Sequence, residues 1–236
     1  MLRGAVEGEY LDPASGCRFV AATPSQQQQL WLAFLDGAQR SYRKHGVESA
    51  LEYDQIADGA STSLFFVAIH PTGAVVGGMR AQGPYTDVDQ AHAIAEWAGR
   101  PGTQQLRREI QARIADGLIE MKTGWVDDHT ERRAEVTDAL ARIFIHSLRL
   151  LNVRHAIGTV SQHARRRWRS CGGAVCDTVQ PVAYPNDHYS TVLMTWDSHH
   201  FAHLAAPHQL PRLTSEAAQL KTHSQQLVLP GQQGCA

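Results

Sequence analysis

The chain has 236 residues, 43% of them hydrophobic, and its 22 basic and 23 acidic side chains give a formal net charge of −1. This length predicts one large domain, with or without a tail. The charge balance argues against general electrostatic binding to nucleic acid or to an anionic membrane. The chain contains no apolar run of the roughly 18 residues that a membrane span needs, and its N-terminus lacks the apolar stretch of a secretory signal. We therefore expect a cytoplasmic protein with no membrane span and no nucleic-acid partner.

The first half of the chain predicts a helix, a hairpin, a helical insert and a strand. Apolar residues recur at helical spacing from about residue 25 to residue 45. Two apolar runs at 63–69 and 75–82, joined by a turn containing Pro71 and Gly73, predict a β-hairpin. Residues 88–116 have a helical pattern that glycine and proline interrupt, and 118–126 have the composition of a strand.

The second half predicts a strand–helix–strand unit followed by a second pair of strands. Asp128 and Glu131 have the spacing of a capping box, which predicts a helix that ends near residue 152. A strand at 155–160 and a basic helix at 163–170 come next, before strands within 174–183 and 189–196. The resulting fold class is α/β with a mixed sheet, in which the strands at 118–126 and 155–160 are parallel neighbours.

A change in composition at residue 198 predicts where the domain ends. The segment 198–236 is rich in His, Gln, Pro and Ala, and three prolines would interrupt a helix. We expect a domain at 1–197 and a poorly ordered tail at 198–236, with a short helix near 215–226.

Four short stretches resemble the GCN5-related N-acetyltransferase (GNAT) fold. They are Val76-Gly77-Gly78-Met79-Arg80, Ile119-Glu120-Met121-Lys122, Ala164…Trp168…Gly172 and Val192-Leu193-Met194-Thr195-Trp196-Asp197. Within that superfamily they are most similar to the branch of acyl-homoserine-lactone synthases and long-chain N-acyl amino acid synthases. The resemblance covers about residues 15–197 and implies a mixed central sheet with flanking helices.

The chain departs from the pattern of this superfamily in three places. The stretch 131–136, which matches the pyrophosphate-binding turn, contains no glycine. The Ser-Arg pair that usually follows the strand glutamate is Met121-Lys122 here. Trp168 replaces a tyrosine, and an indole N–H is no general acid near neutral pH.

The resemblance implies that Glu120 is the catalytic base of an acyl transfer and that Arg80 and Trp125 contact the acceptor. A carboxylate in a partly desolvated cleft has a raised pKa, which suits a base. A guanidinium such as that of Arg80 can hold a substrate carboxylate with two hydrogen bonds. The alternatives are an ordinary edge-strand glutamate that faces water and an arginine that caps a strand end.

The donor is expected at the start of the helix after Asp128 and on a cluster of arginines. Free N–H groups and the helix dipole favour an anion there, so the resemblance implies contacts from Arg132, Arg133, Ala134 and Val136. Four arginines within 165–169, with Arg166 and Arg167 at their centre, would bind the 3′-phosphate of coenzyme A or an acidic acyl-carrier protein. The alternatives are plain helix capping and a solvated helix face.

The remaining candidate residues favour structural roles. His199, His200 and His203 include an i, i+4 pair, but no cysteine or carboxylate completes a ligand set, and we expect no metal. Cys171 and Cys176 have neither a metal-binding spacing nor a catalytic partner, which indicates a packing role.

These observations predict an N-acyltransferase that moves an acyl group from an acyl-CoA or acyl-carrier-protein thioester to the amine of a small metabolite, such as an amino acid. One alternative is an enzyme of the same fold that uses acetyl-CoA on another amine. The other is a catalytically silent module that binds a ligand or partner, which Trp168 and the missing glycines favour.

Overall fold

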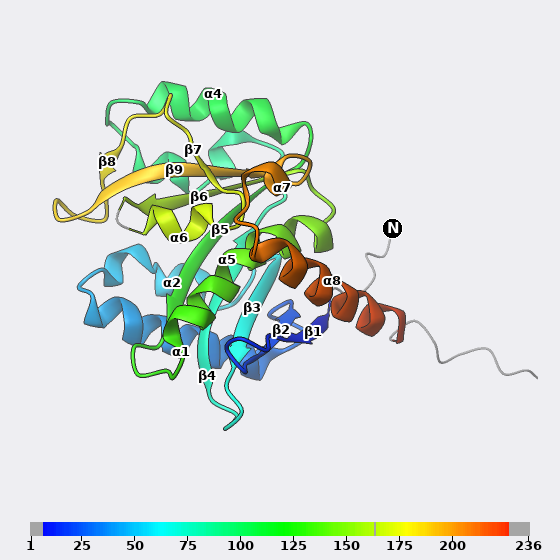
Figure 1. Cartoon of the computed structure of the whole chain (residues 1–236). Coiled ribbons are helices and arrows are strands. Elements are labelled where there is room, and N and C mark those ends of the chain that lie inside the picture. Colours follow the sequence, from blue (N-terminus) through cyan, green and yellow to red (C-terminus); the bar gives the residue numbers. More distant parts are fainter. Residues whose placement is uncertain (1–6, 163, 227–236) are drawn as a thin grey trace, which may run out of the picture.

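The computed structural model describes residues 7–162 and 164–226 and has three layers, with helices on both faces of a nine-stranded sheet (Figure 1). The strands are β1 (Gly8–Leu11), β2 (Arg18–Ala22), β3 (Leu64–Ile69), β4 (Val75–Gln82), β5 (Leu118–Val126), β6 (His155–Ser161), β7 (Ala174–Val175), β8 (Val182–Ala183) and β9 (Ser190–Asp197). Their order across the sheet is β1-β2-β3-β4-β5-β6-β9-β7, and β8 also pairs with β9.

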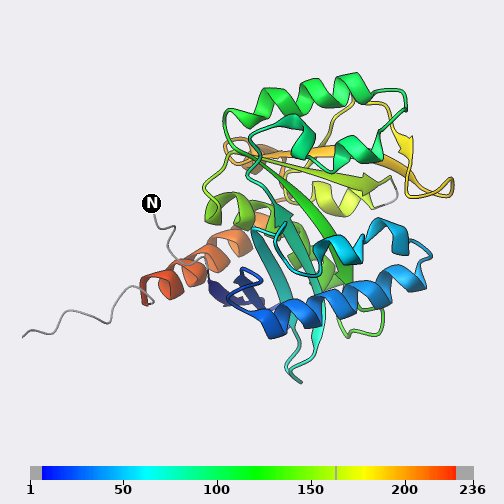
Figure 2. The ribbon, with the colours of Figure 1, turned by 180° about the vertical axis from the view of Figure 1, so that it is seen from behind.

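The helices divide between the two faces of this sheet. They are α1 (Gln28–Lys44), α2 (Tyr53–Ile56), α3 (Ala93–Glu96), α4 (Thr103–Ile114), α5 (Arg133–Leu150), α6 (Arg165–Arg169), α7 (Phe201–Leu204) and α8 (Gln209–Gln226), with 3₁₀ turns η1 (Glu48–Ala50) and η2 (Val88–Gln90). Helices α5 and α8 cover one face (Figure 1), and α1, α3 and α4 cover the other, as the reverse view shows (Figure 2). None of the helices within the described residues is long and apolar enough to span a membrane.

The predicted mixed sheet is confirmed. Strands β3 and β4 form the expected hairpin, and β5 and β6 are parallel neighbours joined by α5. Alternate residues of a strand point to opposite faces. Leu118 therefore lies on the face that α4 covers, and Ile119 lies on the face that α5 covers. The strand expected within 174–183 is instead two short strands, β7 and β8, on the same partner β9. Residue 163, in the predicted basic helix, lies outside the described residues.

A β-bulge interrupts the pairing of β4 with β5, close to the point where the pairing of β5 with β6 ends. Gly78 and Arg80 of β4 pair with Trp125 and Lys122 of β5, so β5 has one extra residue between these two pairs. Thr123, at this point, has a φ of 55°, which is unusual for a β-branched residue. A bulge bends its strand and ends regular pairing, and the pairing of β5 with β6 stops at Glu120. The two strands are therefore splayed beyond that residue.

The start of α5 differs from the prediction. Arg132 is the N-cap residue, in a left-handed conformation, and no side chain caps the helix. The carboxylate of Asp128 instead contacts the Lys44 ammonium at 2.7 Å and the Arg133 guanidinium at 2.9 Å. The predicted capping box of Asp128 and Glu131 is therefore wrong. Strands β1 and β2 were also not predicted.

The segment after residue 197 is not a poorly ordered tail over its described part. Helix α8 begins at Gln209 rather than near 215, and it packs against β1 and α5. A fully buried guanidinium, that of Arg142, joins these elements. It donates to the carboxylates of Glu216 and Asp12 at 2.8 Å and to the Gln209 side chain at 2.9 Å. We call Asp12, Arg142, His146, Gln209 and Glu216 the C-terminal clamp. Residues 227–236 lie outside the described residues.

Candidate active site

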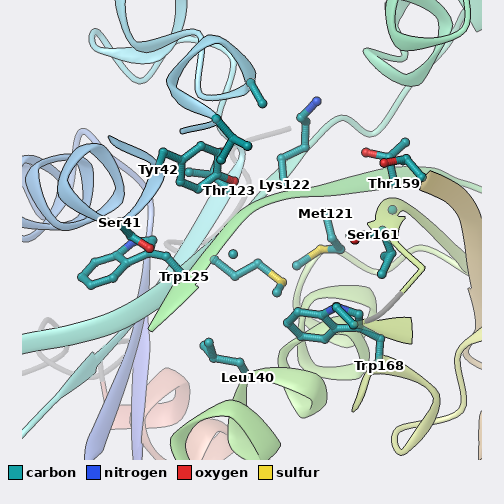
Figure 3. A pocket seen from close by; sticks show the side chains of 18 of the residues that line it. Ser41, Tyr42, Met121, Lys122, Thr123, Trp125, Leu140, Thr159, Ser161 and Trp168 are labelled. Atoms are coloured by element: carbon teal, nitrogen blue, oxygen red, sulfur yellow. The ribbon is translucent and has the colours of Figure 1, made fainter. Parts of the chain in front are cut away.

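A cavity of about 400 Å³ lies where β5 and β6 separate. Because the strands are splayed, side chains from both faces of the sheet line it. They include Ser41, Tyr42, Met79, Glu96, Met121, Lys122, Thr123, Trp125, Arg133, Thr137, Leu140, Phe144, Thr159, Ser161, Arg167, Trp168, Tyr184 and Tyr189. Figure 3 shows Met121 and Lys122 leaving β5 on opposite sides, with Met121 on the side of Trp168. The cavity therefore passes through the sheet.

The part of the cavity on the α5 side is apolar. Met79, Met121, Leu140, Phe144 and Trp168 line it. The rings of Phe144 and Trp168 have centroids 5.5 Å apart, so the indole is held against the helix. Methionine side chains are flexible and adapt to irregular apolar ligands. This part of the cavity can accept a hydrocarbon chain.

The part on the opposite face is polar and charged. The Lys122 ammonium lies 3.1 Å from Oε1 of Glu96 and also contacts Nδ1 of His92. Nε2 of His92 lies 2.6 Å from a carboxylate oxygen of Glu52, and Thr159 donates to Oε1 of Glu96 at 3.1 Å. We call Glu52, His92, Glu96, Lys122 and Thr159 the cavity cluster. It joins the helical insert to β5 and β6.

Glu96 is the most buried carboxylate of this cluster, with 4% of its surface exposed. Burial raises the pKa of its carboxyl, but the charge of Lys122 and the hydrogen bonds from His92 and Thr159 outweigh burial and hold the pKa below its ordinary value. Glu96 is therefore ionised at neutral pH. Oε1 has these three neighbours, whereas the buried Oε2 has no hydrogen-bond partner within the described residues.

Glu120, the expected base, does not line the cavity. It is fully buried, and its oxygens accept hydrogen bonds from the Tyr85 hydroxyl at 2.8 Å and from the backbone N–H groups of His92 and Ala93 at 2.8 and 3.1 Å. A carboxylate at the first N–H groups of a helix stabilises that helix. Glu120 thus positions α3, and the expectation that it faces a cleft is wrong.

The two expected acceptor contacts differ in position. Arg80 is buried behind the cavity, where its guanidinium donates to the hydroxyls of Thr123 and Thr62, both at 3.2 Å. It therefore supports the bulge rather than capping a strand end. Trp125 lines the cavity, and its indole N–H is buried without a hydrogen-bond partner in the described part of the chain.

Of the six residues expected to contact the donor, two line the cavity and four do not. Arg133 and Arg167 line the cavity. Arg132 points away and donates to the backbone carbonyl of Ala14 at 3.3 Å, and Val136 is part of the core. Ala134 and Arg166 are exposed residues outside the cavity lining.

Cationic side chains gather at the rim of the cavity beside α5. Asp128 holds Lys44 and Arg133 there, and Nε2 of His45 lies 3.9 Å from the same carboxylate. Nε of Arg133 is buried and has no hydrogen-bond partner among the described residues. We call Lys44, Arg133 and Arg167 the cationic rim. An anionic group can bind there through side chains, without the glycine-rich turn that this chain lacks.

One group of described residues has metal-ligating atoms close together, namely His92, Glu96 and Glu120, within 4.8 Å of one another. The Lys122 ammonium lies 3.1 Å from Glu96 and 3.9 Å from Glu120. A metal ion would have to displace this ammonium, so the donor set suits the lysine better. The histidines near 200 belong to no such group within the described residues, and His200 instead contacts Asp197 at 3.1 Å.

The fold is that of the GNAT acyltransferases. The chain is similar to the structure of FeeM, an N-acyl amino acid synthase from uncultured soil microbes, with a TM-score of 0.57 and 11% identity over 82% of this chain and 97% of that one. It is also similar to an acyl-CoA N-acyltransferase from Pseudomonas aeruginosa, with a TM-score of 0.50 and 12% identity over 76% and 99%. The GNAT family N-acetyltransferase YhbS from Escherichia coli, in complex with CoA, has a TM-score of 0.50 and 12% identity over 84% and 91%. These identities show the fold alone.

The sequence relatives are mycobacterial. The chain is 43% identical to the uncharacterized protein Rv1356c of Mycobacterium tuberculosis (strain ATCC 25618 / H37Rv), over 86% of this chain and 78% of the relative. The same values hold for the uncharacterized protein Mb1391c of Mycobacterium bovis. The chain belongs to the family of these proteins, and no family model matches it.

Proposed function

We propose that the protein is an N-acyltransferase that moves an acyl group from a thioester of coenzyme A or acyl-carrier protein to the amine of a small metabolite, such as an amino acid. The observation that carries the proposal is the cavity that passes through the sheet where β5 and β6 separate. It lets two substrates meet from opposite faces. Beyond Glu120, β5 has no partner in β6, so its backbone groups can bind a donor's pantetheine arm.

The two sides of the cavity support different substrates. The cationic rim suits the phosphate of the donor, and the apolar part beside it suits an acyl chain longer than acetyl. The polar part, with the cavity cluster and Trp125, suits an amine acceptor. Structures of the same fold are described as an N-acyl amino acid synthase and an acyl-CoA N-acyltransferase, which agrees with this division.

A colorimetric assay of thiol release tests the proposal. The protein is incubated with acyl-CoA thioesters from acetyl to hexadecanoyl and with each amino acid or simple primary amine, and products are identified by mass spectrometry. We expect thiol release that depends on the amine, together with an N-acylated product. Parallel assays with acyl-carrier-protein thioesters test the second donor class. No amine-dependent release with any of these donors would contradict the proposal.

A catalytically silent binding module is the second candidate, because the ring that lines the cavity on α6 is Trp168, which supplies no acid to a leaving thiolate. Thermal unfolding with and without acyl-CoA separates the two candidates. A rise in Tm without turnover with any donor favours the module.

A further inference from the structure

Glu96 presents a carboxylate that is only half satisfied. Its Oε1 is held by Lys122 and Thr159, both at 3.1 Å, and lies 2.9 Å from Nδ1 of His92. Its Oε2 is buried and has no partner within the described residues, and the side chain lines the cavity. An unpaired buried oxygen is costly and rare. The three neighbours fix the carboxylate at the cavity wall, and a ligand donor that entered there would satisfy the unpaired oxygen.

The chemistry around this oxygen selects a cation. The carboxylate is ionised at neutral pH, and a charge-assisted N–H···O bond is stronger than a neutral one. Tyr42 and Tyr184 line the same cavity, and aromatic rings favour a nearby ammonium. We infer that Glu96 binds the acceptor's primary ammonium group through Oε2 and takes its proton, so that it is the catalytic base. This inference rests on the N-acyltransferase function proposed above.

The step balances as follows. The ammonium gives one proton to Oε2, and the freed lone pair attacks the thioester carbonyl carbon, which forms the C–N bond. The tetrahedral intermediate then breaks the C–S bond, and a second proton passes from the nitrogen to the leaving sulfur. The products are an amide and a thiol, and Glu96 holds the remaining proton.

The cavity cluster offers that proton a route to solvent. Oε1 of Glu96 lies beside Nδ1 of His92, and Nε2 of His92 lies 2.6 Å from Glu52, whose side chain is 25% exposed. The titratable groups around Glu96 are His92 beside α3, Glu120 and Lys122 on β5, Tyr42 on α1, and Glu52 and Tyr184 in loops. Burial raises the pKa of Tyr42 to about 12, so its hydroxyl stays neutral in the working range.

A binding experiment tests the inference without turnover. n-Butylammonium chloride and 1-butanol are titrated into the full-length protein by calorimetry at pH 7. We expect n-butylammonium to bind the wild type at least tenfold more tightly than 1-butanol, and Glu96→Gln to remove this preference. The control is Glu109→Gln, which alters a three-partner carboxylate on α4 outside the cavity and should retain it. Equal binding of both probes to the wild type would overturn the inference, whatever the variants do.

Kinetics give the second test, with whichever acceptor supports turnover. Glu96→Gln should lower kcat/KM for that acceptor by about 10²–10⁴ at pH 7. The remaining rate should rise with pH toward the pKa of the free amine, while acyl-CoA still raises Tm. A variant that turns over normally at pH 7 would exclude Glu96 as the base. If the wild type binds n-butylammonium through Glu96 but transfers no acyl group, the proposed function fails and the cation site stands.

Discussion

Two polar clusters within the described residues have similar side chains but differ in how the carboxylate at their centre is bound. In the C-terminal clamp, both oxygens of Glu216 are bound, by Arg142 and by His146 at 2.8 Å. In the cavity cluster, one oxygen of Glu96 is bound and the other is not. Both oxygens of Glu216 are thus satisfied within the fold, although Nδ1 of the neighbouring His146 has no partner among the described residues, whereas Glu96 leaves the desolvation cost of one oxygen to a ligand. We therefore expect the clamp to act on stability and the cavity cluster to act on function.

Breaking the clamp should have the largest effect on stability. Arg142→Met removes the cation that the buried carboxylates of Asp12 and Glu216 share. We expect the free energy of unfolding to fall by about 3–5 kcal/mol, as measured by urea denaturation. Arg212→Met is the control, because Arg212 is 37% exposed and pairs at the surface with Asp138. Its effect should stay below about 1 kcal/mol. A loss of similar size in both variants would show that the clamp adds no buried ion-pair energy.

Glu120→Gln changes a carboxylate whose two oxygens are both hydrogen-bonded, in contrast to the nearby Glu96, which has one unpaired oxygen. The amide would place a donor against the Tyr85 hydroxyl or the N–H groups of His92 and Ala93, so the free energy of unfolding should fall by about 1–3 kcal/mol. The dependence of kcat on pH should stay as in the wild type, in contrast to Glu96→Gln. If the folded Glu120 variant loses activity about 10²-fold and regains it at high pH, Glu120 is the base after all.

Lys122→Met tests how far the Lys122 ammonium stabilises the ionised carboxylate of Glu96. Burial raises the pKa of Glu96, and the Lys122 ammonium is the largest of the causes that lower it, so its loss should raise this pKa. In the wild type that pKa is lowered, so Glu96 contributes stability above its unfolded pKa of about 4.3, and this is lost as pH falls through the folded pKa. The variant should therefore be about 1–3 kcal/mol less stable at pH 7, and the difference should narrow toward pH 4. Urea denaturation at both pH values measures it. A difference that does not change with pH would assign the lysine to packing alone.

Elements with a long periodic pattern could be predicted from the sequence, and α8 shows why others could not. The predicted hairpin, β5, α5 and β6 all bury apolar residues at regular spacing. Over residues 209–220 of α8, the buried positions are Gln209, Leu213, Glu216 and Leu220, which share one face of the helix, but two of them are polar. The two polar side chains are buried because they contact Arg142 of α5, which also binds Asp12 in the N-terminal segment. The sequence of α8 alone therefore does not predict that this face is buried.

The residues of the candidate site that could be predicted also lie on elements with a local sequence pattern. Trp125, Arg133 and Arg167, which were selected from the sequence, line the cavity, and the elements that carry them, β5, α5 and the basic helix, were located from local patterns. Glu96 was missed, since the insert that carries it reaches β5 and β6 only through tertiary packing. The i, i+4 spacing of His92 and Glu96 was a local signal that could have indicated it. Glu120 was placed on the correct strand, but its burial under α3 is not visible in the sequence.

The smallest predicted effect separates two neighbouring arginines of the same helix. Arg167 lines the cavity and belongs to the cationic rim, whereas Arg166 is exposed outside it. Both variants remove one positive charge, so long-range attraction of an anionic donor changes equally, and only the local contact differs. Arg167→Ala should raise the KM for acyl-CoA several-fold at low salt, in line with about 1 kcal/mol for an exposed charge pair, and this rise should shrink at high salt. Arg166→Ala should leave the KM near that of the wild type. Equal changes in both variants would mean that the donor senses the net charge of α6 and makes no specific contact with Arg167.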